Sequence, residues 1–103
     1  MFEKTFYLVK VTNKGKDGKE RFSHYGKCFE GTYRKISLDD DNPAWYIKEY
    51  GYYSYNSAYK AMKSIRKYFD TYDFSYSDIQ VDKVTVEFES EEEYLRVANN
   101  RRL

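Results

Sequence analysis

The amino-terminal part of the chain carries apolar side chains on both of its alternating faces. Residues 4–12 read KTFYLVKVT, with Phe6 and Leu8 on one face and, on the other, Tyr7, Val9 and Val11. Successive side chains of a strand point to opposite sides of the sheet. Apolar groups on both sides therefore predict a strand in the interior of a sheet.

Three further segments alternate between apolar and polar positions. Residues 13–20 (NKGKDGKE) contain the glycine, Asn and Asp typical of a chain reversal and predict a long basic hairpin turn. Residues 21–29 alternate as the returning strand, and residues 33–38 predict another strand. After an acidic loop that ends at Pro43, residues 45–50 (WYIKEY) alternate again and predict a strand.

The spacing then changes from that of a strand to that of a helix. Residues 54–70 carry apolar positions at the i, i+3, i+4, i+7 spacing of a helix that packs on a sheet, with Ser54 or Asn56 as N-cap. The predicted buried stripe consists of Ala58, Ala61, Met62, Ile65, Tyr68 or Phe69, and Tyr72.

The carboxy-terminal part predicts one more strand and one short helix. Residues 70–78 form a polar connection rich in aromatic residues, and residues 83–89 then alternate, with Val84, Val86 and Phe88 on one face. Ser90 and Glu93 have the spacing of a capping box, so a helix should run through Tyr94, Leu95, Val97 and Ala98. The whole pattern predicts an α+β fold with an antiparallel sheet of three to five strands, the main helix across it and a short C-terminal helix.

Composition indicates a core built from rings. The chain has 103 residues, enough for one domain (1–103), and its 13 tyrosines and 7 phenylalanines make up nearly half of the 41% hydrophobic residues. The mean hydropathy of −0.94 undervalues tyrosine, whose ring is buried while its hydroxyl stays hydrated. We therefore expect an ordered domain.

Charge and cysteine content exclude several classes of protein. The net charge is +1, but residues 1–35 hold nine Lys/Arg against four Asp/Glu, whereas residues 36–103 hold nine against 13. An acidic block contains Glu87, Glu89, Glu91, Glu92 and Glu93. The single cysteine excludes an internal disulfide, and no apolar run is long enough to cross a bilayer. We expect a soluble protein of the cytoplasm with no membrane partner.

No residue pattern in the chain predicts catalysis, a cofactor or a metal site. Asp39–Asp41 and Glu91–Glu93 are consecutive acids whose side chains point apart, and the former lacks the alternation of a calcium loop. His24 and Cys28 are four residues apart in a predicted strand, about 13 Å at ~3.3 Å per residue, too far for a nucleophile and its base. Phosphate-loop, dinucleotide-binding and metalloprotease motifs are absent. We expect a protein that is not an enzyme.

Aromatic density singles out a candidate recognition surface. The segment Trp45–Tyr59 contains six tyrosines and one tryptophan, and several of them should reach solvent at a predicted strand-to-helix corner. Exposed tyrosine is enriched at binding surfaces, although a ring-filled core is the alternative explanation. We call the tyrosine corner the set Tyr50, Tyr52, Tyr53, Tyr55 and Tyr59.

A basic helix face is the second candidate. Lys60, Lys63 and Lys67 share one face of the predicted helix, with Arg66 beside them and no acid between Ser54 and Phe69. These cations could meet phosphates or an acidic protein surface, or they could simply keep the helix soluble. We call the basic helix face the set Lys60, Lys63 and Lys67.

The run YGYYSYNSAYKAM, residues 50–62, resembles the strand-to-helix corner of the arm-binding domains of phage integrases, where an aromatic residue precedes a Ser/Thr cap and alanines face the sheet. The abundance of Lys, Tyr, Asn, Asp, Ile and Phe with one proline is also similar to small early phage proteins of low-GC Gram-positive hosts, among them anti-CRISPR proteins. That resemblance implies a phage-encoded binding protein which inhibits a host defence machine, a protein or ribonucleoprotein, by steric occlusion.

Two other interpretations stay open. The first is a nucleic-acid-binding domain in which tyrosines stack on bases and lysines contact phosphate, namely Lys14, Lys16, Lys19, Lys60, Lys63 and Lys67. The acidic second half of the chain argues against it. The second is an enzyme, for which the sequence supplies neither an activated nucleophile nor a metal centre. A homodimer is compatible with each of these functions.

Overall fold

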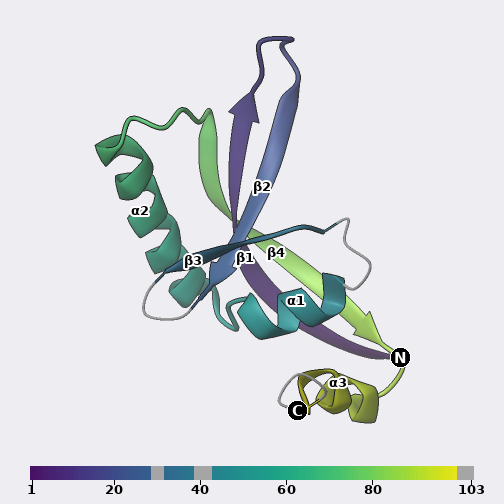
Figure 1. Cartoon of the computed structure of the whole chain (residues 1–103). Coiled ribbons are helices and arrows are strands. Elements are labelled where there is room, and N and C mark those ends of the chain that lie inside the picture. Colours follow the sequence, from purple (N-terminus) through teal and green to yellow (C-terminus); the bar gives the residue numbers. More distant parts are fainter. Residues whose placement is uncertain (29–31, 39–42, 100–103) are drawn as a thin grey trace.

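Among the residues that the structure describes, the sheet contains four antiparallel strands. A computed structural model describes residues 1–28, 32–38 and 43–99, in the order β1 (Phe2–Lys14), β2 (Glu20–Lys27), β3 (Tyr33–Ile36), α1 (Pro43–Tyr50), α2 (Tyr55–Thr71), β4 (Asp78–Phe88) and α3 (Glu91–Asn99). The strand order in the sheet is β3-β2-β1-β4 (Figure 1). The predicted α+β class, main helix and short C-terminal helix are confirmed, and β1 lies in the interior of the sheet.

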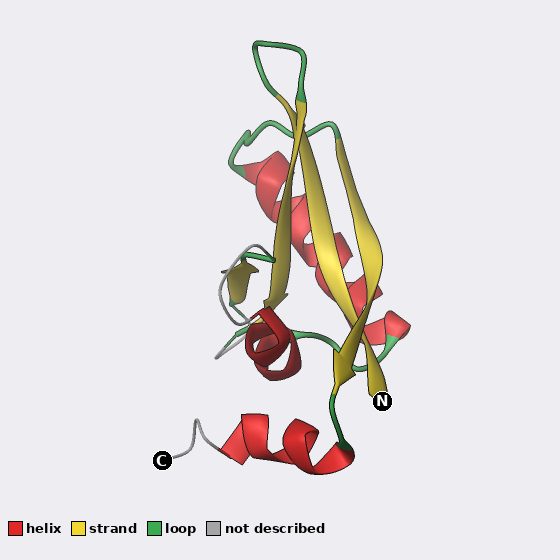
Figure 2. Cartoon of the chain, turned by 90° about the vertical axis from the view of Figure 1, so that its right-hand side faces the viewer, coloured by secondary structure: helices red, strands yellow, loops and turns green. Residues whose placement is uncertain are grey.

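Helices cover both faces of the sheet (Figure 2). On one face, α2 packs its buried stripe against Val9 and Val11 of β1 and Ile79 of β4. On the other face, Phe6 and Leu8 of β1 form a second core with residues of α1, β3, β4 and α3, among them Ile47, Ile36, Val86, Phe88 and Tyr94. The alternation of apolar residues in β1 therefore separates two cores, as its sequence predicts.

Tyr52 continues the sheet where β2 ends. β2 pairs with β1 from Val9 opposite Tyr25 up to the hairpin turn. Beyond Val9, the backbone of Tyr52 takes the place of β2: the Tyr7 N–H donates to the Tyr52 carbonyl at 2.8 Å, and the Tyr52 N–H donates to the Tyr7 carbonyl at 2.9 Å. These two hydrogen bonds fix the turn between α1 and α2 against the central strand.

The β1–β2 hairpin projects beyond the helices (Figure 1). Its turn has Gly18 at φ 80°, a conformation that favours glycine. Asp17 accepts hydrogen bonds from the Lys19 N–H at 3.0 Å and from the Arg21 guanidinium at 2.9 Å. The backbone N–H of Lys19, followed by Arg21, lowers the pKa of the Asp17 carboxyl. The predicted turn is confirmed.

The helix α2 follows its predicted pattern except near its end. Ser54 is the N-cap, and its Oγ accepts from the Ser57 N–H at 3.2 Å. Residues Ala58, Ala61, Met62 and Ile65 are buried, and Phe69 packs against them. The prediction that Tyr72 completes the stripe is wrong: Tyr72 is the C-cap, where the helical spacing stops, and its ring is exposed.

The prediction of a strand at residues 45–50 is also wrong, because these residues belong to α1. Pro43 begins that helix, a position where a fixed φ is favourable and no N–H is needed. Ala44 and Ile47 lie three residues apart and pack on the second core, which is helical spacing. Six residues are too few to separate a period of 2 from one of 3.6, and packing on the sheet selects the helix.

The last strand and the last helix both pack on the second core. β4 begins at Asp78, five residues before the predicted start, because it pairs with β1 along its whole length. Ser90 caps α3 as predicted, since the Glu93 N–H donates to Ser90 Oγ at 3.1 Å. The Glu93 carboxylate accepts at 3.1 Å from the N–H of Glu89, one residue before the N–H that would complete a capping box. Tyr94 of α3 packs on Phe88, and its carbonyl accepts a hydrogen bond from the buried Lys48.

Candidate functional site

The structure divides the tyrosine corner into buried and exposed members. The corner is a turn between two helices rather than between a strand and a helix. Tyr52 is buried, with 9% of its surface exposed, and burial, followed by the nearby Tyr33, raises the pKa of its hydroxyl to about 12. Tyr50 is half-buried, whereas Tyr53, Tyr55 and Tyr59 are exposed. Part of the corner is therefore core and part is surface.

The exposed rings of the corner already contact neighbouring groups. The Tyr53 hydroxyl donates to the Lys48 carbonyl at 3.2 Å, and the Lys27 ammonium lies 4.4 Å from the centre of the Tyr53 ring. The rings of Tyr55 and Tyr59 stack with 6.0 Å between their centres. Each exposed corner ring thus has one side occupied by another residue of the chain.

The basic helix face lies where the sequence predicts it. Lys60, Lys63 and Lys67 are exposed on the side of α2 opposite its buried stripe. The Lys63 ammonium lies 5.4 Å from the centre of the Tyr59 ring, so this face adjoins the corner at that point. Arg66 differs from the lysines, since its guanidinium donates to the Ile79 carbonyl of β4 at 2.7 Å.

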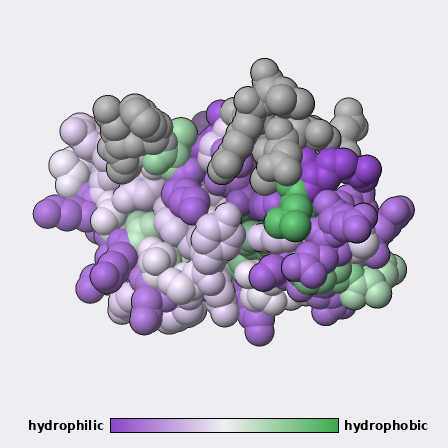
Figure 3. Space-filling view, turned by 90° about the horizontal axis from the view of Figure 1, so that it is seen from below, coloured by the Kyte–Doolittle hydropathy of each residue, from purple (hydrophilic) through white to green (hydrophobic). Residues whose placement is uncertain are grey.

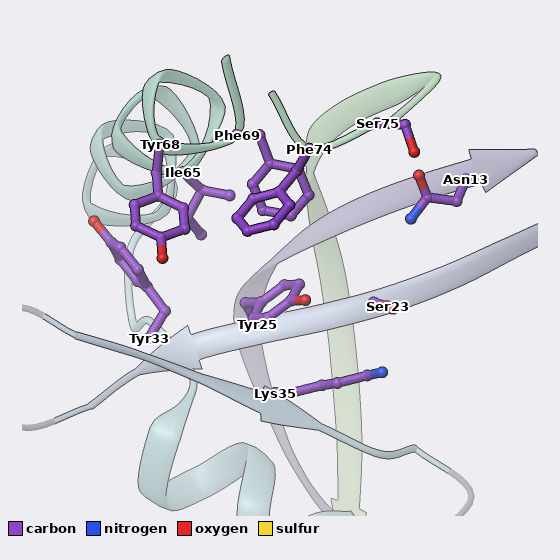
Figure 4. A pocket seen from close by; sticks show the side chains of 10 residues that line it. All are labelled: Asn13, Ser23, Tyr25, Tyr33, Lys35, Ile65, Tyr68, Phe69, Phe74 and Ser75. Atoms are coloured by element: carbon purple, nitrogen blue, oxygen red, sulfur yellow. The ribbon is translucent and has the colours of Figure 1, made fainter. Parts of the chain in front are cut away.

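A groove that the sequence did not predict lies on the opposite flank of α2. It has a volume of about 530 Å³ and opens between the carboxy-terminal half of α2 and the strands β2 and β3 (Figure 4). Its rings come from all three elements and the loop after α2. We call this hollow the aromatic groove, and its lining is Asn13, Ser23, Tyr25, Tyr33, Lys35, Ile65, Tyr68, Phe69, Phe74 and Ser75.

Strand alternation places the floor and one wall of the groove. Tyr25 of β2 lies directly opposite Lys35 of β3, and both point to the face of the sheet that α2 covers. The intervening residues of β3 point to the other face, where Ile36 is buried and the guanidinium of Arg34 lies 4.8 Å from the Tyr50 ring. Because α2 packs on β1 and β4, it leaves this part of β2 and β3 uncovered.

The opposite wall is a cluster of exposed rings. Tyr68 and Phe74 have 52% and 51% of their surfaces exposed, and their ring centres are 5.8 Å apart. Phe69, deeper in the groove, lies edge-on to Phe74 at 5.6 Å. In Figure 4 the rings of Tyr68 and Phe74 face Tyr33 and Tyr25 across the open space. Unlike the corner rings, they border a hollow.

The groove offers hydrogen bonds together with apolar surface. Burial raises the pKa of the Tyr25 hydroxyl, which stays neutral and able to donate at physiological pH. Lys35 is the one cation among the described residues that line the groove. An apolar space with a few polar groups around it is typical of a pocket that receives a side chain or a small ligand.

Few reactive or metal-binding side chains lie close together elsewhere in the described parts of the chain. His24 Nε2 lies 3.0 Å from an Asp82 carboxylate oxygen, next to a second hollow of about 440 Å³ lined by residues of β2 and β3. Cys28 follows β2 as a free thiol of intermediate exposure. Within the described parts of the chain, no group of three or more His, Cys, Asp and Glu side chains could hold a metal ion. The acidic run Asp39–Asp41 lies outside the described residues.

The view onto the end of the molecule that carries α3 concerns the described residues of that surface. Figure 3 shows that the described hydrophobic side chains reach the surface there only in small, separate places among hydrophilic ones. No helix in the described ranges is long and apolar enough to cross a membrane. The aromatic groove and the tyrosine corner both expose tyrosine rings, the residue type that is enriched at interfaces.

One signal in the sequence points to the groove. Tyr68 and Tyr72 are four residues apart, and Phe74 and Tyr76 follow in the polar connection. Such density predicts exposed rings, but not the hollow, which depends on how far β2 and β3 extend past α2. Comparisons of the chain with family models, with curated proteins and with solved structures each gave no match.

Proposed function

We propose that this chain is a binding protein, not an enzyme, which captures a partner protein by admitting an apolar or aromatic side chain of that partner into the aromatic groove. The observation that carries the proposal is the hollow of about 530 Å³ flanked by rings that are half exposed. Buried aromatic anchors in well-packed pockets dominate the free energy of many protein interfaces. The tyrosine corner and the basic helix face would form the rim of the contact.

The distribution of charge favours a protein partner over nucleic acid. A protein that binds single strands combines stacking rings with cations that follow the phosphates. Here Lys35 is the one cation among the described groove residues, and the lysines of the hairpin turn lie on the projecting end of the hairpin (Figure 1). The basic helix face meets exposed rings through Lys63 and Tyr59. That junction keeps nucleic-acid binding as the second candidate.

The biological setting of the proposal depends on the resemblance to small phage proteins. A phage-encoded inhibitor of this kind acts in the host cytoplasm and blocks a host defence machine by occupying one of its surfaces, as anti-CRISPR proteins do. Such a mechanism needs a folded surface with anchoring rings and no catalytic group. The groove and its rim would supply that surface.

A matched pair of variants tests the groove as the capture surface. Tyr55 and Tyr68 lie on the same helix with 53% and 52% exposure, but only Tyr68 lines the groove. We expect Tyr68→Ala to weaken capture of the partner from a Gram-positive host lysate tenfold or more, about 1.4 kcal/mol. Tyr55→Ala should weaken it less than threefold. Both proteins should keep the wild-type melting temperature within a few degrees.

The opposite result would contradict this choice of surface. If Tyr55→Ala abolishes capture and Tyr68→Ala does not, the tyrosine corner is the anchor. Nuclease treatment of the lysate distinguishes the second candidate, because capture that depends on nucleic acid disappears with it. Direct binding of an oligonucleotide that falls about a thousandfold between 50 and 200 mM salt would indicate roughly six phosphate contacts and displace the protein proposal.

A further inference from the structure

The outer edge of β4 carries backbone groups whose direction follows from the hydrogen bonds of β1. The N–H and carbonyl of Tyr7 both point to Tyr52, on the β2 side of β1. Since the direction alternates along a strand, Phe6 and Leu8 point to β4 and bond their register partners there. Those partners are Val84 and Asp82. The alternate set of β4 residues therefore directs its N–H and carbonyl groups to the outer edge, namely Val81, Lys83, Thr85 and Glu87.

A side-chain contact at the end of the same edge agrees with this assignment. Ile79 belongs to the same alternate set as Val81 and Lys83, and its carbonyl accepts the hydrogen bond from Arg66 at 2.7 Å. β4 is the terminal strand of the sheet, and no described segment pairs with its outer side. An edge strand of 11 residues with free backbone groups is a template for pairing with another chain.

The charges near this edge are unfavourable within one copy of the chain. Glu3 of β1 and Glu87 of β4 are direct register partners, so their carboxylates lie side by side on one face of the sheet. Like charges that face each other across strands are destabilising. Both residues are exposed, and neither forms an ion pair with any residue that the structure describes. Lys83, four residues before Glu87 on the same face, is exposed as well.

We propose that two copies of this chain pair through β4, antiparallel and about a two-fold axis at Thr85. In that register Lys83 of each copy lies directly opposite Glu87 of the other, twice by symmetry. The partner's ammonium then offsets the repulsion between Glu3 and Glu87. An axis at Lys83 would instead place two ammonium groups together, and an axis at Glu87 two carboxylates. The four-stranded sheets of the two copies would join into one continuous sheet.

Charge exchange tests this register. Equilibrium sedimentation of the wild-type chain should show a species of twice 12.5 kDa. Lys83→Glu and Glu87→Lys should each weaken self-association tenfold or more, because each places like charges opposite one another in the pair. A 1:1 mixture of the two variants should associate at least tenfold more tightly than either alone, since every Lys then faces a Glu. The double variant K83E/E87K should behave like the mixture.

A control variant separates this pairing from net charge. Lys14→Glu makes the same change of charge at an exposed position in β1, outside the β4 edge, and should leave self-association within twofold of wild type. Circular dichroism confirms that each variant is folded. The proposal is overturned if the wild type stays at the mass of one chain up to about 1 mM, a concentration that corresponds to ~4 kcal/mol. It is overturned equally if mixing the single variants gives no gain.

Discussion

The tyrosine corner and the aromatic groove have similar residues but different surroundings. Both lie along α2, one on each flank, and both expose tyrosines to about half of their area. At the corner, rings stack on each other and on lysines, as Tyr59 does on Tyr55 and Lys63. Around the groove, Tyr68 and Phe74 face an open space. Aromatic density predicts exposed rings, and only the backbone around them decides whether they enclose a hollow.

The largest expected effect separates the two kinds of ring within the corner. Tyr52→Ala should lower the free energy of unfolding by about 3 to 5 kcal/mol, because the ring is buried in the first core. Tyr55→Ala should lower it by about 1 kcal/mol at most, the scale of one exposed ring pair. Urea unfolding of both variants measures the difference. Equal losses would mean that the corner packs as one unit.

The next effect concerns the residue shared by the core and the groove. Ile65 is buried and also lines the groove, so Ile65→Ala should destabilise the protein by about 2 to 5 kcal/mol. Lys63→Ala, on the exposed side of the same helix, should change the free energy of unfolding by no more than about 0.5 kcal/mol. Thermal or urea unfolding gives both values. A large loss for the lysine variant would show that the outer face of α2 contributes to the fold.

High pH sharpens the contrast between buried and exposed tyrosines. The raised pKa of Tyr52, about 12 against 10.0 for an ordinary tyrosine, means that folding favours the neutral hydroxyl. This contribution is complete below pH 10.0 and is lost as the pH rises toward about 12. Urea unfolding across that window should show a falling stability, and Tyr52→Phe should reduce the fall. Tyr55→Phe, which removes the hydroxyl of an exposed corner ring, serves as the control in the same measurement.

The smallest expected effect concerns the start of α2, between the two regions. Ser54→Ala removes the hydroxyl that accepts from the Ser57 N–H and should cost about 1 kcal/mol. Ser54→Asp should retain the cap. Because the cap lies at the corner end of the helix, capture at the groove should be unchanged in both variants. A loss of capture with Ser54→Ala would show that partner binding at the groove depends on the tyrosine corner.

Local patterns predict most of the fold. Four features depend on neighbours in sequence, and the structure confirms them: the interior position of β1, the hairpin turn, the buried stripe of α2 up to Phe69, and the Ser90 cap of α3. The strand predicted at residues 45–50 is wrong because six residues fit both the strand period of 2 and the helical period of 3.6. The helix is selected by the packing of Ile47 on a distant strand. The prediction that Tyr72 is buried is wrong because the helix ends at that residue.

The candidate site is predicted less completely than the fold. The sequence indicates exposed tyrosines near residue 55 and the basic helix face, and the structure places Tyr55 and Lys63 at the surface. It cannot assign Tyr52 to the core, since that depends on two backbone hydrogen bonds to Tyr7. The groove joins Tyr25 and Tyr33 to Tyr68 and Phe74, residues brought together only by tertiary packing.

The pairing of the first strand with the last has a consequence for synthesis on the ribosome. Phe2 is the register partner of Phe88, so the sheet cannot close until nearly all of the described chain has been made. Until then β1 is paired with β2 on one side only, and the core around Val9 and Val11 lacks Ile79. Contacts this distant in sequence form slowly and leave apolar strands exposed in the meantime. Nascent chains that stop before β4 are therefore the forms most in need of a chaperone.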